Sequence, residues 1–423
     1  MNISYNWLKD YINFTENPTK IAEILTDLGL EIGGIEKIQS IKGGLEGLVI
    51  GEVLEKTQHP NADKLSCTKI NLGNKNSLSI VCGAPNVAVG QKVVVATIGT
   101  TLFDGNDSFK IKKSKLRGEI SEGMICGEDE IGLGKNNDGI MILPQEVKVG
   151  TLAKDYFKVE TDYILDVDIT PNRADALSHY GVARDLAVYF GANENYKTLK
   201  FPDLKPLRKT ADLPFNITIE DKNACSRYCA ISIKGVVVKD SPDWIKKKIN
   251  AIGLTPINNI VDITNFVMHE LGQPLHAFDY AVTGKEIKIK SNLENTKFKT
   301  LDGIERKLEG DQLMICNSTE PICIAGVYGG EKSGVSEKTK DIVLESAYFN
   351  PVSIRKTSKS HSLKTDASYR FERGVDPKMT VKALQRAANL IVEIADGNIG
   401  SEIKDEIVNE VKNFSVDFKF SNC

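Results

Sequence analysis

Regularly spaced apolar residues predict a helix near the start of the chain. They lie on one face at positions i, i+3, i+4 and i+7, namely Ile21, Ile24, Leu25 and Leu28. Asn17 is a favoured N-cap, Pro18 suits the first helical position, and Gly29 is expected to end the helix. The chain therefore begins with a helical segment.

Between residues 43 and 151 the apolar residues instead form short runs, separated by Gly, Asn, Asp and Pro. The runs are Leu48–Leu54, Leu78–Cys82 and Lys92–Thr97. Such spacing predicts a small β-barrel or sandwich. A second helix is expected after it, with Asp175 as cap, Gly191 as its end and an apolar stripe at Ala183, Leu186, Ala187 and Phe190. The barrel thus interrupts a mostly helical element made of residues 1–42 and 152–200.

A mixed α+β domain is expected over residues 213–395, after a polar linker with two prolines at 201–212. One helix should start at Ser241–Asp243, carry three isoleucines and stop at Gly253, and another should run from Met379 to Ala395. The strand-like runs are Ala230–Ile233, Glu286–Lys290 and Asp341–Leu344. Residues 396–423 are too few to fold alone, so we expect them to begin a further module.

The segment from Val261 to Asp279 holds an unusual number of polar groups among apolar residues. These are Thr264, Asn265, His269, Glu270, Gln273 and His276. A buried polar group costs free energy unless it finds a partner, and a core segment has no need of so many. A small-molecule site does need a few placed polar groups in an apolar wall. The segment is therefore our first candidate for a binding site.

Composition narrows the class of protein. The chain has 423 residues, 41% hydrophobic and 26% charged, with a net charge of −3, so no overall basic field is available to hold nucleic acid. No secretory signal and no run of roughly 20 apolar residues is visible. The eight cysteines contain no C-x-x-C pair, which favours reduced thiols. We expect a cytoplasmic protein without a membrane segment.

Three motif-like segments do not meet the requirements of the chemistry they suggest. His269–Glu270 lacks the second histidine of a helical zinc site, because residue 273 is Gln. Lys356–Ser360 lacks the partner motif of a class I synthetase, and the glycines between Gly326 and Gly334 lack the spacing of a phosphate-binding loop. We therefore expect no metal site and no cofactor site in this chain.

Some charged residues allow two interpretations. A basic run at Lys110, Lys112, Lys113, Lys115 and Arg117 could neutralise phosphates, but acidic residues follow it closely, and charge alone favours a solvated strand face. Glu345, after the apolar run 342–344, is either a buried acceptor or a strand-end surface charge, and the sequence alone favours the surface. A further set of charged residues lies before the last helix and is most simply interpreted as an ion-pair network. These residues are Arg370, Glu372, Arg373 and Asp376.

Two signatures in the barrel segment resemble a known domain. His59–Leu65 (His-Pro-Asn-Ala-Asp-Lys-Leu) and Cys82–Asn86 (Cys-Gly-Ala-Pro-Asn) are similar to the tRNA-binding OB-fold domain of aminoacyl-tRNA synthetases and of standalone tRNA-binding proteins. Further motifs at Val261–Asn265, Gln273–Asp279 and Arg370–Pro377 resemble the editing (B3/B4) domain of the β subunit of bacterial phenylalanyl-tRNA synthetase.

This second resemblance covers essentially the whole chain. It implies a multidomain α+β protein in which an OB-fold barrel is inserted in a helical N-terminal domain and followed by a B3/B4 editing domain. Subunits of that family are nearly twice as long, and residues 396–423 match only the beginning of their next module, which is called B5. The resemblance therefore implies a truncated chain.

The resemblance also implies a function. The complete enzyme attaches phenylalanine to its tRNA with ATP and magnesium, as an α2β2 assembly with a catalytic α subunit. The part represented here would bind tRNA(Phe) and hydrolyse tyrosine wrongly joined to it. An apolar pocket rejects an added hydroxyl only modestly, so a second site that recognises the tyrosine hydroxyl would improve discrimination.

By resemblance, Glu345 matches the residue that reads the tyrosine hydroxyl. His276, Thr264 and Asn265 match residues that position the ester and the attacking water. The pocket walls match small residues at Gly329, Thr365 and Ala367. Thr255 departs from the family, because many relatives have arginine there. The alternative is a tRNA-binding and assembly scaffold with an inactive pocket, and a third hypothesis is a free-standing RNA-binding protein.

Overall fold

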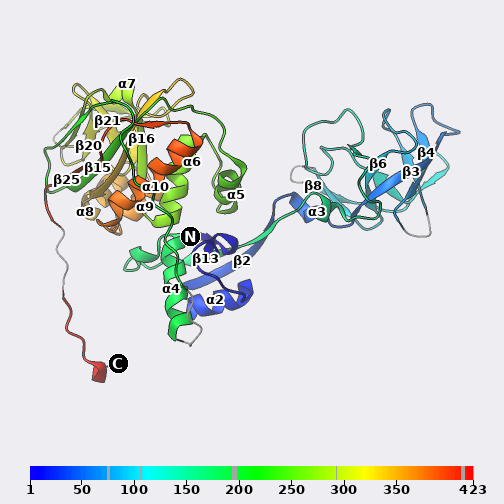
Figure 1. Cartoon of the computed structure of the whole chain (residues 1–423), viewed down its shortest axis with the longest axis horizontal. Coiled ribbons are helices and arrows are strands. Elements are labelled where there is room, and N and C mark those ends of the chain that lie inside the picture. The colour runs from blue at the N-terminus through cyan, green and yellow to red at the C-terminus, as the bar shows by residue number, and fades with distance from the viewer. Residues whose placement is uncertain (74–76, 105–106, 193–197, 292, 411–414, 423) are drawn as a thin grey trace. The chain divides into compact units, whose positions relative to one another are not determined.

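The structure, a computed structural model, forms two compact units (Figure 1). One consists of residues 1–36 together with 163–423, and the other of residues 37–162. The residues described are 1–73, 77–104, 107–192, 198–291, 293–410 and 415–422. Among them, no helix is both long enough and apolar enough to cross a membrane.

The unit of residues 37–162 is built on an antiparallel sheet in the order β11-β6-β3-β4-β5, with β12 paired to β6. Its strands are β3 (Leu48–Gln58), β4 (Ser66–Asn71), β5 (Leu78–Cys82), β6 (Lys92–Thr97), β11 (Gly123–Ile125) and β12 (Ile142–Leu143). Two hairpins join β7 (Thr101–Asp104) to β8 (Asp107–Lys110) and β9 (Ser114–Leu116) to β10 (Glu119–Ser121). The short helices are η1 (Lys42–Leu45) and α3 (Ala153–Tyr156). All three predicted strand runs are confirmed, and β3 extends beyond its predicted end.

The N-terminal part contains a sheet that the apolar pattern did not reveal. Its strands β1 (Asn2–Ser4), β13 (Thr161–Asp168) and β2 (Glu31–Gln39) lie in that order. The helices are α1 (Tyr5–Leu8), α2 (Pro18–Asp27), η2 (Ala174–Ala176) and α4 (His179–Ala192). Asn17 caps α2 as predicted, through the Lys20 amide. The prediction of Asp175 as a cap is wrong, because α4 begins later and the Ser178 hydroxyl accepts from the Gly181 amide instead.

Two five-stranded sheets form the body of the mixed domain. The first has the order β14-β17-β20-β21-β22 and the second β16-β23-β15-β24, with β25 also paired to β15. The first contains β14 (Asn216–Ile219), β17 (Glu286–Lys290), β20 (Met314–Cys316), β21 (Pro321–Ile324) and β22 (Tyr328–Gly329). The second contains β16 (Leu275–Asp279), β23 (Asp341–Phe349), β15 (Cys225–Lys234), β24 (Asn398–Ile399) and β25 (Lys404–Ile407). Residues 398–407, assigned to a further module from the sequence, thus pair with β15.

Helices surround these sheets. They are α5 (Asp243–Ala251), α6 (Asn259–Leu271), α7 (Tyr280–Thr283), α8 (Pro351–Ser360), α9 (Asp366–Phe371) and α10 (Met379–Ile394), and η3 (Phe420–Asn422) lies near the C-terminus. A hairpin of β18 (Lys297–Lys299) and β19 (Glu305–Lys307) completes the domain. The predicted helices around Ile245 and from Met379 are confirmed as α5 and α10.

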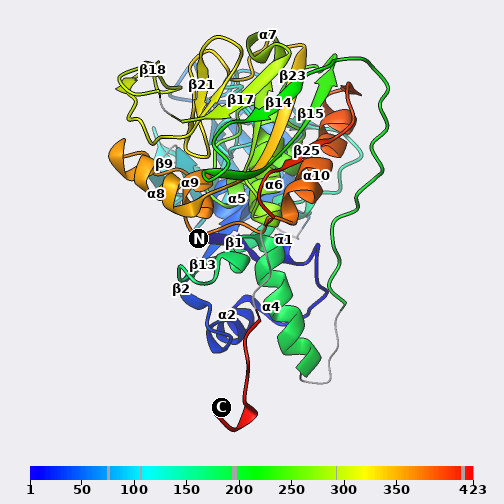
Figure 2. The same cartoon turned by 90° about the vertical axis from the view of Figure 1, so that its left-hand side faces the viewer.

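The strand β23 separates two hydrophobic cores. Ile342 and Leu344 belong to the core formed with α5, α6 and α10, while Val343, Ala347 and Phe349 belong to the core between the two sheets. Figure 2 shows α6 and α10 beside the strands β15 and β23. Because successive side chains of a strand point to opposite faces, β23 has one residue set for each core.

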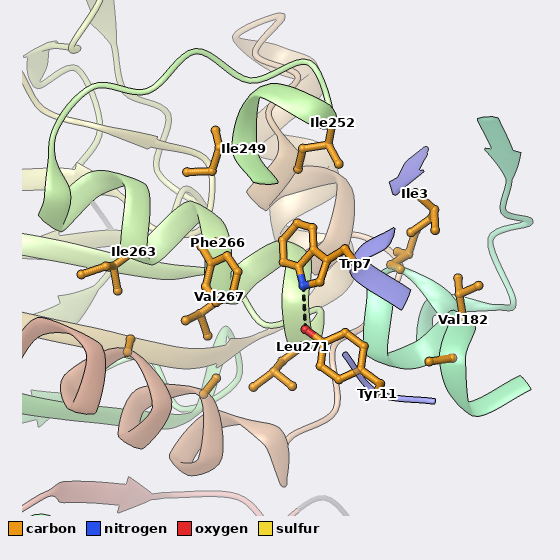
Figure 3. Packing of buried hydrophobic residues seen from close by; sticks show 14 of the residues in the cluster. Ile3, Trp7, Tyr11, Val182, Ile249, Ile252, Ile263, Phe266, Val267 and Leu271 are labelled. Atoms are coloured by element: carbon orange, nitrogen blue, oxygen red, sulfur yellow. Dashed lines mark hydrogen bonds between the residues drawn. The ribbon is translucent and has the colours of Figure 1, made fainter. Parts of the chain in front are cut away.

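The N-terminal segment packs into the core of the mixed domain (Figure 3). The Trp7 ring stacks on Phe266 of α6, with 4.9 Å between ring centroids, and on His179, at 3.8 Å. The Trp7 indole N–H donates to the Tyr11 hydroxyl at 2.8 Å, and that hydroxyl donates to Glu270 at 3.1 Å. A buried aromatic stack and a satisfied polar chain therefore join α1 and α4 to α6.

We predict that Phe266→Ala lowers the free energy of unfolding by roughly 3–5 kcal/mol, because the ring is 1% exposed and its loss leaves a cavity under Trp7. Ile257→Ala is the matched control, since Ile257 is 66% exposed and should change stability by less than about 0.5 kcal/mol. Urea unfolding measures both. Equal effects of the two substitutions would contradict this packing.

Candidate functional site

The candidate segment of residues 261–279 forms a helix and the strand that follows it. Asn258 caps α6 by accepting from the amides of Ile260 and Val261, and Gly272 ends it in the left-handed conformation with φ 81°. This conformation favours glycine, because it has no Cβ to clash. The turn then leads the chain into β16, which carries His276.

His276 and Glu345 face each other across two neighbouring strands. They are direct partners in the antiparallel pairing of β16 with β23, so both side chains lie on the same face of the sheet. That face also carries Val343 and Phe278, which belong to the core between the sheets. Glu345 is 5% exposed and lies within β23. The interpretation of Glu345 as a strand-end surface charge is therefore wrong, because the strand continues to Phe349.

Gly329 brings the other sheet close to His276. A Cβ at this position would lie 3.3 Å from His276 Cε1 and 2.9 Å from Leu301 Cδ1, so a larger residue would displace one of them. Thr365 caps α9 and its hydroxyl donates to the carbonyl of Val327, two residues before Gly329, at 3.1 Å. Ala367, on the first turn of α9, packs against the same core. The predicted wall residues thus gather on one side of the domain.

Three polar atoms in this region are buried without a hydrogen-bond partner. They are Glu345 Oε2, His276 Nε2 and Tyr228 Oη. Tyr228 lies on β15, on the same face as Glu345, because it is two residues from Ala230, the direct partner of Glu345. Buried polar atoms in folded proteins are nearly always paired, so a group of unpaired ones marks a place for a polar ligand or water.

Burial changes the acid–base behaviour of both predicted site residues. Desolvation raises the pKa of Glu345 to about 8, and the nearby Tyr228 hydroxyl offsets a part of this rise. Desolvation by the surrounding residues lowers the pKa of His276 to about 4, although the residue keeps some exposed surface. His276 is therefore neutral at pH 7, and the pKa of Glu345 lies within about one unit of neutral pH.

Thr264 and Asn265 lie on α6, whose apolar face packs against the opposite face of the sheet. The Thr264 hydroxyl donates to the carbonyl of Val261 at 2.7 Å. Within the described residues, no hydrogen bond joins either side chain to His276 or Glu345, so their roles stay predictions. Thr255 is exposed in the loop between α5 and α6.

The most metal-like pair of the sequence, His269 and Glu270, has a structural role. Glu270 is 2% exposed and accepts from Arg386 at 2.9 and 3.2 Å. His269 lies 3.2 Å from the buried guanidinium of Arg370, through its Nδ1. Across the described part of the chain, no group of three or more His, Cys, Asp or Glu residues is placed to hold a metal ion.

The predicted ion-pair network before the last helix is confirmed only for Arg373 and Glu372. Arg370 is fully buried, pairs with Asp366 at 3.3 Å and donates to the carbonyl of Leu177. Arg373 pairs separately with Glu372 at 2.7 Å. The sequence could not show this division, because it depends on where α9 ends: Arg370 lies within the helix and Arg373 after it.

The barrel signature His59–Leu65 supports the hairpin that carries part of the basic run. His59 Nδ1 accepts from the Asn61 amide at 3.1 Å, so its Nε2 carries the proton and donates to the carbonyl of Leu116 at 3.0 Å. The Asn61 side chain donates to the carbonyl of Arg117 at 3.1 Å. Lys110 and Lys112 line an open groove of about 700 Å³ beside this hairpin.

Tyr228 is the site residue that the sequence analysis missed. Its strand, β15, reads as Cys-Ser-Arg-Tyr-Cys-Ala-Ile-Ser-Ile-Lys, in which a tyrosine is an ordinary core residue. The only signal that could have found it is its two-residue spacing from Ala230, and that signal requires the pairing with Glu345 to be known.

Comparisons with known proteins agree with the two units of the fold. Residues 48–152 match the putative tRNA-binding domain family, and residues 224–396 match the B3/4 domain family. The chain is thus similar to proteins that combine a putative tRNA-binding domain with a B3/4 domain.

Relatives of similar sequence extend this match to nearly the whole chain. The chain is 55% identical to the phenylalanine–tRNA ligase beta subunit of Bacteroides fragilis and 54% identical to that of Bacteroides thetaiotaomicron, in each case over 99% of this chain and 52% of the relative. It is 53% identical to that of Porphyromonas gingivalis, over 99% of this chain and 51% of the relative. The resemblance to phenylalanine–tRNA ligase beta subunits is therefore confirmed, and the chain spans about half the length of these relatives.

We predict that Glu345 makes the protein less stable as the pH rises from 6.5 to 8. In the unfolded chain this carboxyl is ionised throughout the range, whereas in the folded state it holds its proton up to about pH 8. Folding therefore takes up a proton, and stability should fall by about 2 kcal/mol over the range. Glu345→Gln should remove this slope, and Glu337→Gln, at an exposed carboxyl, should keep it. Urea unfolding at several pH values measures the difference, and parallel curves for wild type and Glu345→Gln would contradict it.

Proposed function

We propose that this chain serves as part of the β subunit of a phenylalanine–tRNA ligase, which joins phenylalanine to tRNA(Phe) with ATP and magnesium. The proposal rests on the similarity to phenylalanine–tRNA ligase beta subunits over 99% of the chain. The catalytic α subunit is its partner in an α2β2 enzyme. The parts of the chain described above carry tRNA binding and editing, and activation of phenylalanine belongs to the complete enzyme.

In this proposal the B3/4 domain hydrolyses tyrosyl-tRNA(Phe). The observation that carries it is the buried Glu345 oxygen without a partner. A tyrosine ring entering between the sheets would pair its hydroxyl with this oxygen, and a phenylalanine ring would leave the oxygen unpaired. Leaving a buried polar group unpaired costs about 1–3 kcal/mol, more for a charged one, so the site favours the wrong amino acid for hydrolysis.

The reaction centre lies on the His276 side of the pocket. His276 is neutral at pH 7, so its ring can accept a hydrogen bond from water or donate one to the ester. By the family resemblance we assign Thr264 and Asn265, which lie on α6 at the opposite face of the sheet, to orienting the ester and the attacking water, and water is then the nucleophile. Space for the ring comes from small side chains at Gly329 and Ala367, and from Thr365, whose hydroxyl caps helix α9.

The barrel unit binds tRNA in this proposal, with the OB-fold arrangement that the His59–Leu65 and Cys82–Asn86 signatures suggest. The groove lined by Lys110 and Lys112 is a candidate surface for the phosphate backbone. It also contains Asp129 and Glu130, so its charge is mixed.

Deacylation of tyrosyl-tRNA(Phe) by the complete enzyme tests the editing proposal. At pH 9, where Glu345 is ionised, we expect Glu345→Gln to slow the deacylation of tyrosyl-tRNA(Phe) by about tenfold or more, because the uncharged amide is a weaker acceptor for the phenol. Phenylalanylation should keep its rate. Glu337→Gln, at an exposed carboxyl in the loop before β23, is the control.

His276→Ala should slow the same deacylation while leaving phenylalanylation unchanged. If both variants deacylate tyrosyl-tRNA(Phe) at the wild-type rate, the editing proposal is wrong and the scaffold alternative is favoured.

A further inference from the structure

The inner face of the second sheet carries polar residues beyond the predicted site, and one of them, Tyr228, lies beside Glu345. Tyr228 of β15 is the direct partner of Ala347, and Ala347 is two residues from Glu345 on the same face of β23. Tyr228 is therefore the diagonal neighbour of Glu345. Diagonal neighbours of an antiparallel pair lie about 7–8 Å apart, a separation that aromatic and long side chains span.

The Tyr228 hydroxyl lies near enough to Glu345 for each group to shift the pKa of the other, but the two make no hydrogen bond. The Tyr228 side chain is 0% exposed, and its oxygen has no hydrogen-bond partner. Glu345 Oε2 is in the same state. A phenol group brings a donor and a carboxylate brings an acceptor, so together they form half of a hydrogen-bonding site for a group that both donates and accepts.

The other titratable groups that face Glu345 do not fill this site. Cys225 on β15 and Cys323 on β21 lie close to Glu345, and each thiol donates to a backbone carbonyl, that of Arg227 at 3.6 Å and that of Tyr328 at 3.4 Å. His276, on β16, keeps its Nε2 unpaired on the other side of Glu345.

We propose that Tyr228 is a further specificity-determining residue, and that the hydroxyl of a bound tyrosine bridges Tyr228 Oη and Glu345 Oε2. The inference rests on the proposed editing function. The substrate hydroxyl donates its hydrogen to the Glu345 carboxylate and accepts the hydrogen of Tyr228, which satisfies all three oxygens at once. A phenylalanine ring leaves two buried groups unpaired instead of one, so Tyr228 increases the discrimination.

The bridge has a consequence for pH. The ionised carboxylate of Glu345 is a stronger acceptor for the substrate's hydrogen than the protonated form, whose own hydroxyl must find an acceptor. Tyrosine binding should therefore strengthen as Glu345 ionises between pH 7 and 9, and phenylalanine binding should not change.

Equilibrium binding of L-tyrosine and L-phenylalanine to the full chain, at pH 7 and pH 9, tests the bridge. Tyr228→Phe removes only the hydroxyl, and we expect about a tenfold loss of tyrosine affinity at pH 9 with phenylalanine affinity kept within about twofold. Tyr280→Phe is the matched control, because its hydroxyl donates at 2.7 Å to the carbonyl of Pro214 and lies outside the pocket. It should leave both affinities unchanged.

The double variant Tyr228→Phe/Glu345→Gln completes the test. A shared substrate hydroxyl predicts that the combined loss is smaller than the product of the two single losses. Equal losses for tyrosine and phenylalanine, or no loss of tyrosine affinity in Tyr228→Phe, would overturn the bridge. A wild-type chain that does not prefer tyrosine would instead overturn the proposed editing function itself, and the bridge with it.

Discussion

The burial of β23 on both faces is the constraint on which the rest of the mixed domain depends. One set of its side chains packs with α6 and α10, and the alternate set packs between the two sheets. Since neighbouring strands β16 and β15 cover both of its edges, every residue of its centre is enclosed. Glu345 lies in this centre, and only 5% of its surface is exposed.

This placement explains the chemistry of the site. An ionised group at such a position loses its hydration, so the pKa of Glu345 is raised to about 8, and its second oxygen stays unpaired. Natural proteins tolerate such a cost mainly where it serves function. The pairing of β16 with β23 then places His276 beside the carboxyl, and Gly329 packs so close to His276 that a side chain there would displace it or Leu301.

The sequence predicted the helices and strands of the chain better than it predicted the contacts between them. The strands Leu78–Cys82, Lys92–Thr97 and Glu286–Lys290 were found with the bounds that the structure has, because each is a compact apolar or alternating run between turn residues. The sheet of β1, β13 and β2 was missed, since β2 is mostly exposed and gives no periodic signal. Local pattern carries no information on which distant strands pair.

The same limit applies to the site. Local pattern placed Glu345 on the surface, and only the similarity to a known family pointed to it as a buried acceptor. Tyr228 was not predicted as a site residue, because its position beside Glu345 depends on strand register, which no single segment of sequence determines. Likewise, Arg370 belongs with Asp366 and the Leu177 carbonyl, although its neighbours in sequence suggested another pairing.

A crystal structure of the chain with bound L-tyrosine tests the central claim most directly. The account predicts the ring between the two sheets, with its phenol oxygen about 3 Å or less from Glu345 Oε2. A tyrosine bound elsewhere, or a Glu345 carboxyl that remains unpaired while the phenol points toward His276, would contradict it.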